Sequence, residues 1–416
     1  MGDRGIKGAE RAKFEYAAVL EAVRGLEKFG SRPGLDNIRA ICTALGNPQE
    51  DLRFIHVAGT NGKGSTTQFI SSILSAAGYK TGVYSSPSIR SYRERIQVDG
   101  ENIPREAFAK LGGLILEEPQ IAVTEFELTT AMSFLHFKRE NCDYVVMETG
   151  LGGKEDATNV IPPPEVAALT PISIDHTRVL GSTIGEITAQ KCGIVKDGCR
   201  TVSSAQTPEV REIITKLVQD VVFAPTVEIL EMKQEGTRFK MGGETYEIRL
   251  LGAHQAENAA TAITAAGCLN DARLTRDVIK AGVKKANIPY RFEVTRDKTL
   301  GRGKLLLRDG AHNPAGITAL ARAIRDYFPN RKIAVVMGCL ADKDYASCVK
   351  ILAPLTKSFI AVTPDSPRAL DARKLASIAA EFCEETDVAP SVDAAIKKAA
   401  YGADIILVCG SFTMFI

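Results

Sequence analysis

The chain has 416 residues, of which 45% are hydrophobic and 25% charged, and its formal net charge is +2. This length is too great for one hydrophobic core and predicts two domains, or three. The balanced charge argues against a nucleic-acid partner or a membrane surface, and no window approaches the roughly 18 apolar residues of a membrane-spanning helix.

Cysteine usage and the N-terminal segment indicate the compartment. The nine cysteines are scattered and form no C-x-x-C pair, so the sequence encodes neither a zinc site nor a disulfide framework. Buried, reduced thiols are expected instead. Residues 1–14 lack the apolar core of a signal peptide. We therefore expect a cytoplasmic protein.

The first predicted elements are a strand at 53–58, a glycine-rich segment GTNGKGS at 59–65 and a helix at 64–77. A strand, a glycine turn and a helix N-terminus together build an anion site, because backbone N–H groups and the helix dipole favour negative charge. Lys63 adds a positive charge near the β and γ phosphates of a nucleotide. The alternative is a tight turn without a ligand. Gly64 separates Lys63 from Ser65, whereas the common P-loop places Ser or Thr directly after Lys.

Strands and helices continue to alternate, which predicts an α/β fold with mostly parallel sheets covered by helices on both faces. Further strands are expected at 81–85, 143–149, 166–172 and 200–204, with helices at 125–140, 208–220, 253–270 and 275–286. Between residues 226 and 250, short alternating segments broken by glycines predict a small antiparallel insertion.

A second series of strands and helices begins after the segment 288–293, which breaks the helical pattern. We place a domain boundary there, with residues 1–293 forming a P-loop domain that binds ATP. Residues 294–416 are predicted to form a smaller, Rossmann-like domain.

Two candidate metal ligands follow strands of the first domain. Glu148 comes after the apolar run of the strand at 143–149, and His176 follows the strand at 166–172. Ligands of open α/β sheets bind beyond the carboxyl ends of the strands, so both residues are placed near a metal–nucleotide complex. Mg²⁺ takes one or two carboxylates together with phosphate oxygens and water. A solvated loop glutamate and a structural histidine are the alternatives.

The strand at 81–85 leads into Ser86, whose hydroxyl can face the metal or make a simple ST-turn. Arg90, Arg93 and Arg95 follow on the same segment. Three guanidinium groups suit a polyanionic or dicarboxylate ligand, and a solvated basic loop is the alternative.

In the second domain, Asp309 ends a strand and Pro314 opens a helix. A strand-end aspartate can accept hydrogen bonds from ribose hydroxyls, while Asn313 can cap the helix. Polar groups at strand ends in both domains imply a cleft that closes on its substrates. Lys191 lies on a helix of the first domain, and the residues alone assign it no role.

These motifs, in this order, resemble the folylpolyglutamate synthase and dihydrofolate synthase family of the Mur ligase superfamily. The resemblance covers nearly the whole chain and rests on FGSRPGLDNI, HVAGTNGKGSTT, VTEFELTTA, METGLGG with DATN, SIDHTRVLG, QKCGIVK, GAHQAEN, RFE, DGAHNPAG and VMGCLADKD. It implies ATP and Mg²⁺ as cofactors. It also implies roles for particular residues.

The resemblance implies that Asn61, Gly62, Lys63, Gly64 and Ser65 hold the ATP phosphates, that Ser86, Glu148 and His176 ligate Mg²⁺, and that Asn258, Arg291 and Asp309 contact ATP. Lys191 would be carbamylated and so become an acidic oxygen ligand, and His312 would lie near the γ-phosphate and glutamate. Lys63, Lys191 and His312 are the catalytic candidates.

The pterin-bearing substrate would lie along Gly34, Leu35 and Asp36, along Thr124, Glu125, Phe126 and Glu127, and along Glu155, Asp156 and Ala157. Ser88, Lys154, Gln190 and Tyr290 stand where many family members carry His, Arg, Glu and Gly. These departures leave the ATP and metal positions intact and concern the choice of substrate.

The expected activity is an ATP-dependent ligation of L-glutamate to a pterin substrate through an acyl phosphate, carried out by a monomer. Dihydropteroate and tetrahydrofolate polyglutamate both remain open as acceptors. A Mur-type ligase with another carboxylate acceptor, or a nucleotide-switch module that hydrolyses ATP slowly, are the alternatives.

Overall fold

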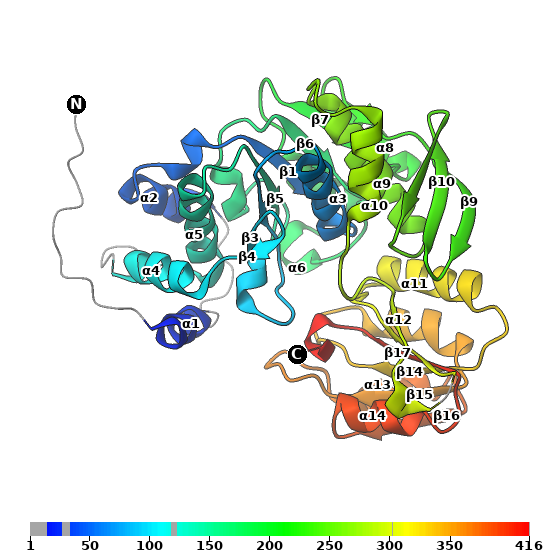
Figure 1. Cartoon of the computed structure of the whole chain (residues 1–416). Helices are drawn as coiled ribbons and strands as arrows, with labels where there is room; N and C mark the ends of the chain where they lie inside the picture. Colours follow the sequence, from blue (N-terminus) through cyan, green and yellow to red (C-terminus); the bar gives the residue numbers. More distant parts are fainter. Residues whose placement is uncertain (1–14, 27–33, 118–122, 302, 416) are drawn as a thin grey trace, which may run out of the picture.

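The computed structural model describes residues 15–26, 34–117, 123–301 and 303–415. Within these ranges the chain forms two parallel-dominated sheets, one in the N-terminal part and one in the C-terminal part, plus a small antiparallel sheet (Figure 1). The predicted α/β fold class is confirmed. The segment 1–14 and residues 29–33 of the FGSRPGLDNI motif lie outside the described residues.

The first sheet has the strand order β4-β3-β2-β5-β1-β6-β7-β8. Its strands are β1 (Phe54–Ala58), β2 (Thr81–Tyr84), β3 (Ile96–Val98), β4 (Glu101–Asn102), β5 (Tyr144–Glu148), β6 (Val166–Leu169), β7 (Arg200–Ser203) and β8 (Val222–Phe223). Six neighbouring strands, β2, β5, β1, β6, β7 and β8, pair in parallel. Strands β3 and β4 continue the sheet beyond β2 with antiparallel pairing. Because β1 and β5 are buried on both faces, they read in the sequence as continuous apolar runs.

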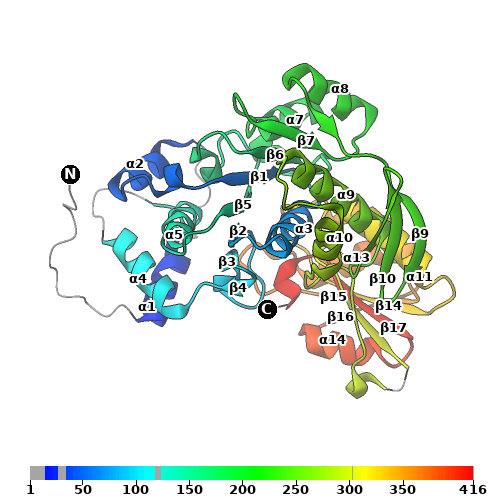
Figure 2. The ribbon, with the colours of Figure 1, turned by 45° about the horizontal axis from the view of Figure 1, so that its top comes forward.

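Helices cover both faces of this sheet (Figures 1 and 2). On one face lie α3 (Lys63–Ala76), α9 (Ala253–Cys268) and α10 (Arg276–Lys285), whose apolar side chains pack with Ile55 and Val57 of β1. On the other lie α1 (Tyr16–Gly25), α2 (Asp36–Ala44), α4 (Arg105–Leu116) and α5 (Glu125–Arg139), which pack with Phe54. Phe54 points to the opposite face from Ile55, and Val57 belongs with Ile55, because successive side chains of a strand alternate between the two faces of the sheet. Beyond β6 and β7 lie α6 (Thr177–Leu180), α7 (Ile184–Cys192) and α8 (Pro208–Leu217).

The predicted insertion is a three-stranded antiparallel sheet of β9 (Glu228–Lys233), β10 (Gly236–Met241) and β11 (Glu244–Ile248). Its buried side chains, Phe239 and Tyr246 among them, join the apolar cluster that contains α9 and α10. The insertion therefore extends the core on the α3 side of the first sheet.

The second sheet has the order β12-β13-β17-β14-β15-β16. Its strands are β12 (Glu293–Thr295), β13 (Leu305–Arg308), β14 (Ile333–Met337), β15 (Ser358–Val362), β16 (Glu385–Ala389) and β17 (Ile405–Cys409). Helices α11 (Pro314–Tyr327), α12 (Tyr345–Leu352) and α13 (Ala372–Ala379) cover one face, and α14 (Val392–Ala399) covers the other. Short 3₁₀ turns are η2 (Pro48–Asp51), η3 (Tyr92–Arg95), η4 (Ala157–Val160), η5 (Lys298–Leu300), η6 (Ala353–Leu355) and η7 (Phe412–Phe415).

The chain passes from the first part to the second at residues 288–293. Glu293 already pairs with Arg308 of the second sheet, and the division between residues 293 and 294 stays a prediction. The two parts also touch through α11, where the Tyr327 hydroxyl lies 3.0 Å from Thr237 Oγ1 and accepts from the Gly252 amide at 3.1 Å. Among the described residues, no helix is both long and apolar enough to cross a bilayer.

Candidate functional site

The glycine-rich loop lies between the end of β1 and the start of α3. Gly62 has φ +83 and directly precedes the helix. The first amides of α3 have no acceptor within the helix, because they belong to its first turn. A β-carbon on Gly62 would stand 2.3 Å from Asn258 Oδ1, which shows that α9 packs directly against the loop. A β-carbon on Gly59 would stand 1.9 Å from Thr170 Oγ1. The loop can hold this shape only with glycine at both positions.

Two lysines converge on the carbonyl of Gly59. Lys191 Nζ donates to this oxygen at 2.8 Å and Lys63 Nζ at 3.3 Å, while Lys63 also reaches the Thr60 carbonyl at 3.4 Å. Burial and the charge of Lys63 lower the pKa of Lys191 to about 7. Burial also lowers the pKa of Lys63, although Glu148 and Asp175 oppose this shift. The site therefore concentrates positive charge that an anionic ligand would neutralise.

Glu148 ends β5 directly beside the first turn of α3. Its side chain is buried, and a β-carbon on Gly64 would stand 3.5 Å from its Oε2 atom. Burial raises the pKa of Glu148 to about 7, against the opposing effects of Lys63, Arg291 and a hydrogen bond from the Ser86 amide. The structure thus places the Ser86 backbone beside Glu148 at the loop, and their role as metal ligands stays a prediction.

His176 lies at the start of α6 in the left-handed region, with φ +53. Its Nε2 atom is 3.0 Å from Lys343 Nζ, and the same ammonium group contacts Asp175 Oδ1 at 2.8 Å. Partial burial and Lys343 lower the pKa of His176 to about 4, and Lys63 and Lys191 contribute in the same direction. Burial would raise the pKa of Asp175, but His176 and Lys343 outweigh it and lower this pKa.

The DGAHNP segment of the second part lies over the glycine-rich loop. Asn313 caps α11, accepting from the Gly316 amide at 2.8 Å. Its Nδ2 atom also donates to Asn61 Oδ1 at 3.1 Å and to Asp175 Oδ2 at 2.9 Å. One side chain therefore fulfils the predicted cap and also links the two parts of the chain.

The other predicted residues of this segment are held by local contacts. Asp309 accepts from the amides of Phe292 and Ala311 at 2.7 and 2.8 Å. His312 Nδ1 lies 2.9 Å from the Gly310 carbonyl, and burial together with Lys343 lowers the pKa of His312 to about 4. Burial lowers the pKa of Arg291, which the carboxylates of Asp309 and Glu148 oppose. Arg291 thus interacts electrostatically with a carboxylate from each part of the chain.

Several predicted substrate residues also have structural roles. Thr124 and Glu127 form a capping box at the start of α5, with mutual contacts of 2.8 and 3.2 Å. Glu125 forms an ion pair with Arg95 at 3.0 Å. The Phe126 ring packs on the METGLGG loop, since a β-carbon on Gly150 would stand 2.5 Å from its Cζ atom. These contacts place the start of α5 beside the loop that follows Glu148.

The remaining substrate candidates lie on the same side of the first sheet. Asp156 is buried and accepts from the Leu151 amide at 2.7 Å, whereas Glu155 is exposed and Ala157 begins η4. Gly34 and Leu35 precede α2, which begins at Asp36 and packs against η4 and α5. The three stretches therefore converge around η4 and α5, and Asp156 is near enough to Lys63 and Lys191 to oppose the lowering of their pKa values.

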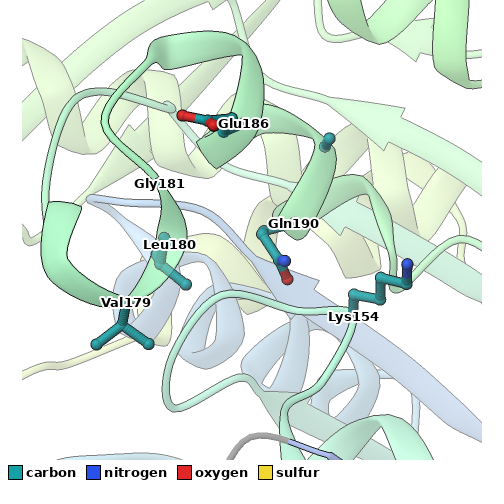
Figure 3. Close-up of a pocket in the computed structure, with 7 residues that line it drawn as sticks. Lys154, Val179, Leu180, Gly181, Glu186 and Gln190 are labelled. Atoms are coloured by element: carbon teal, nitrogen blue, oxygen red, sulfur yellow. The ribbon is translucent and has the colours of Figure 1, made fainter.

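A cavity of about 370 Å³ lies beside this region, between α6, α7 and the segment after Gly153. Lys154 and Gln190, two of the departures from the family pattern, line it together with Val179, Leu180, Gly181, Glu186 and Ala189 (Figure 3). Gln190 borders this cavity, while the neighbouring Lys191 points to Gly59.

Sequence reasoning missed Lys343 and the linking role of Asp175. Lys343 lies in the loop after β14, so the rule that ligands gather beyond the carboxyl ends of strands would have found it. The three arginines after Ser86 do not form one cluster. Arg93 donates to the Ile103 carbonyl, Arg95 pairs with Glu125, and Arg90 donates to Tyr290.

Comparisons with known proteins agree with this architecture. Residues 57–266 match the Mur ligase middle domain and residues 290–412 match the Mur ligase glutamate ligase domain. The chain is 36% identical over 384 residues to a dihydrofolate synthase/folylpolyglutamate synthase of Bacillus subtilis, covering 86% of this chain and 88% of that protein.

Solved structures of similar proteins contain nucleotides. A folylpolyglutamate synthase of Mycobacterium tuberculosis, complexed with ADP and AMPPCP, superposes with a TM-score of 0.84 and 31% identity over 96% of this chain and 97% of that one. A bifunctional folylpolyglutamate synthase/dihydrofolate synthase with Mn, AMPPNP and L-glutamate bound gives a TM-score of 0.82 and 27% identity over 98% of both chains.

Proposed function

The chain belongs to the folylpolyglutamate synthase/dihydrofolate synthase family of Mur ligases, and from this premise we propose that it joins L-glutamate to a pterin-bearing acid at the expense of ATP. The observation that carries the proposal is Lys63 at the glycine-rich loop, where it contacts the Gly59 carbonyl beside the buried Glu148 and beneath the polar groups of the second part. Such a site suits a triphosphate whose terminal group reacts between the two parts.

The reaction needs activation, because a carboxylate is a poor electrophile. A carboxylate oxygen of the pterin substrate attacks the γ-phosphorus of ATP, the bond to the β-phosphate oxygen breaks, and an acyl phosphate and ADP form. The amine of L-glutamate then attacks the acyl carbon, phosphate leaves, and an amide with one released proton results. Lys63 and the amides at residues 62–65 neutralise charge on the transferring group, and holding three substrates between the two parts favours both steps.

The residues at the loop fit the Mg²⁺ ion that the family implies. A buried carboxylate, a hydroxyl and an imidazole come from Glu148, Ser86 and His176. In the described ranges, no three His, Cys, Asp or Glu side chains gather into a metal site of their own. Phosphate oxygens and water would then complete the coordination shell, as Mg²⁺ prefers. When bound, the ion would neutralise phosphate charge and orient the γ-phosphate.

Carbamylation of Lys191 also belongs to the proposal. A neutral amine is needed to add CO₂, and a pKa lowered to about 7 leaves a large neutral fraction near physiological pH. The product would place an acidic oxygen group on the Gly59 side of the site. Intact-protein mass in bicarbonate buffer, compared with Lys191→Met, tests for the added mass of one CO₂.

The remaining ATP contacts follow from position. Asn61, Gly62, Lys63, Gly64 and Ser65 would surround the phosphates, and Asn258 would contact the nucleotide from α9, where it already touches Gly62. Arg291 and Asp309 would meet the nucleotide from the second part, and His312 would lie toward the γ-phosphate and glutamate.

The pterin substrate would lie along residues 34–36, 124–127 and 155–157, which converge around η4 and α5. We also propose that the protein acts as a cytoplasmic monomer without nucleic-acid or membrane partners. The net charge of +2 supports the absence of those partners, and the nine free thiols support the cytoplasmic location.

The test is to incubate the protein with ATP, Mg²⁺, L-glutamate and either dihydropteroate or tetrahydrofolate, and to measure product mass. We expect ADP release that depends on both the pterin and glutamate. Product from dihydropteroate alone, from tetrahydrofolate alone or from both decides which reaction the chain performs. ADP release that is indifferent to both acceptors and to glutamate would refute the proposal, and product with a cell-wall precursor would favour the Mur-type alternative.

A further inference from the structure

The segment that joins the two parts of the chain has an unusual backbone. Tyr290 and Phe292 have φ +57 and +49, in the left-handed region that side chains with a β-carbon disfavour. The Tyr290 carbonyl accepts from the Gly310 amide at 2.9 Å, and its amide donates to Glu293 Oε2 at 3.0 Å. Phe292 is buried in the core of the second part. This segment is therefore anchored to the second part.

The side chain of Tyr290 contacts both parts of the molecule. Its ring stacks on Phe415 of η7, with centroids 4.5 Å apart and an interplanar angle of 18°. Its hydroxyl accepts from Arg90 Nε at 2.7 Å, and the Arg90 guanidinium carbon lies 5.1 Å from the ring centroid. Tyr290 is only 5% exposed. One side chain thus carries a stacking contact, a charged hydrogen bond and a cation–π contact.

Arg90 lies on the short loop that also carries Ser86. Glu94 ties this loop together, because its carboxylate accepts from the Ile89 amide at 2.8 Å and from the Ser91 amide at 3.0 Å. At the other end of the loop, the Ser86 amide donates to Glu148. A displacement of Arg90 would therefore be passed along a stiff segment to the contact with Glu148.

From this arrangement we propose that Tyr290 is a positioning residue, which fixes the loop 86–91 to the second part and so sets the spacing between the two halves of the nucleotide site. The contact costs backbone strain at φ +57, which glycine would avoid. The three side-chain contacts offset that strain. Tyr290 itself touches no reacting group.

Three variants separate these contacts. Tyr290→Phe keeps the ring and removes the hydrogen bond to Arg90, and Arg90→Gln removes the charge. Tyr290→Gly removes the whole side chain at a position where glycine adopts φ +57 without strain, so this variant is expected to fold. Tyr401→Phe is the matched control, because it deletes a phenol hydroxyl from a side chain that is 94% exposed.

The first readout is amide hydrogen exchange of the full-length protein, followed by mass spectrometry over residues 86–91. We expect Tyr290→Phe and Arg90→Gln to speed exchange in this segment about tenfold, as the loss of a charged hydrogen bond predicts. Exchange over 86–91 should be faster in Tyr290→Gly than in either of these variants, and in Tyr401→Phe it should be as slow as in the wild type. Unchanged exchange over 86–91 in Tyr290→Phe overturns the proposal.

The second readout rests on the proposed function. Tyr290→Phe is expected to raise the KM for ATP about three- to tenfold while kcat changes less, because the halves of the site are spaced less firmly. The double variant with Arg90→Gln should show no further rise, since both changes remove the same contact. If the two changes raise KM independently, so that their effects multiply in the double variant, Tyr290 and Arg90 do not act through one shared contact. A wild type without ligase activity refutes the proposed function, while the exchange measurement still decides the role of Tyr290.

Discussion

The carboxyl ends of the strands carry different kinds of side chain in the first and second sheets. At the first sheet, Lys191 and Glu148 are buried and Lys63 is half-buried, all three have shifted pKa values, and the two lysines share one carbonyl. At the second sheet, Asp309 and His312 are held by their own backbone, while Asn313 and Lys343 reach across to the first part. In the proposed reaction, the carboxyl edge of the first sheet (the first edge) would bind the reacting charge, and the carboxyl edge of the second sheet (the second edge) would position the two parts.

The largest expected effect comes from the first edge. Lys63→Ala should lower turnover by about three orders of magnitude, because it removes a charge that stabilises the transferring phosphoryl group. Steady-state release of ADP in the presence of pterin and glutamate measures this. Lys216→Ala, an exposed lysine on α8, is the control. A Lys63→Ala variant that keeps most of its glutamate-dependent ADP release would contradict the assignment of the chemistry to this edge.

The next effect concerns the link between the edges. The ion pair of Lys343 with Asp175 spans 2.8 Å, and its side chains are only 7% and 10% exposed. Lys343→Met leaves Asp175 buried without its cation and is expected to lower the free energy of unfolding by about 3 kcal/mol. Urea denaturation measures this, with Lys350→Met on α12 as the matched exposed control. If the two variants unfold alike, the link contributes little to holding the parts together.

The pH dependence of the free energy of unfolding reports on the buried carboxylate of Glu148. Burial raises the pKa of Glu148 from 4.5 to about 7, so the folded state binds this proton more tightly than the unfolded state. The contribution of this group to stability should therefore fall by about 2 to 3 kcal/mol as pH rises from 4.5 to 7. The lowered pKa of Lys191 acts above pH 7 instead, where stability should rise toward pH 10.5.

Glu148→Gln is expected to remove this falling contribution, so that stability rises more steeply with pH below 7 than in the wild type, as measured by urea denaturation at several pH values. Glu209→Gln, an exposed glutamate of α8, should keep the wild-type slope. The lowered pKa values of His176 and His312 make stability rise with pH over the same window, so the contribution of Glu148 is the difference between the wild-type and Glu148→Gln profiles. A difference that does not fall from pH 4.5 to 7 would show that Glu148 is paired in solution.

The smallest effect tests the second edge. Asn313→Asp keeps a good N-cap for α11 but replaces the amide that donates to Asn61 and Asp175. We expect a loss of about 1 kcal/mol in stability with an unchanged helix content by circular dichroism, because a carboxylate then faces Asp175. Asn313→Ser keeps a cap without adding charge and should cost less. Equal losses in both variants would mean that the added carboxylate is not repelled by Asp175.

Local patterns in the sequence were sufficient for much of the fold. The strand, glycine loop and helix at 53–77, the antiparallel insertion and the main strands of both sheets were predicted, because hydrophobic period and glycine positions are properties of neighbouring residues. The short strands β3, β4, β8, β12 and β16 were not predicted. Their residues are partly exposed, so they lack a clear apolar pattern.

By itself, the sequence determined the glycine-rich loop, the α/β architecture and the family, since these rest on short motifs and on hydrophobic patterns among neighbouring residues. Only the tertiary structure decided that Lys191 meets Lys63 at Gly59, that Asn313 reaches Asn61 across 252 residues of sequence, and that Arg90 reaches Tyr290. It also decided which charges are buried and therefore which pKa values shift. Packing brings distant residues together and excludes water from around them, and a linear pattern contains no information about either.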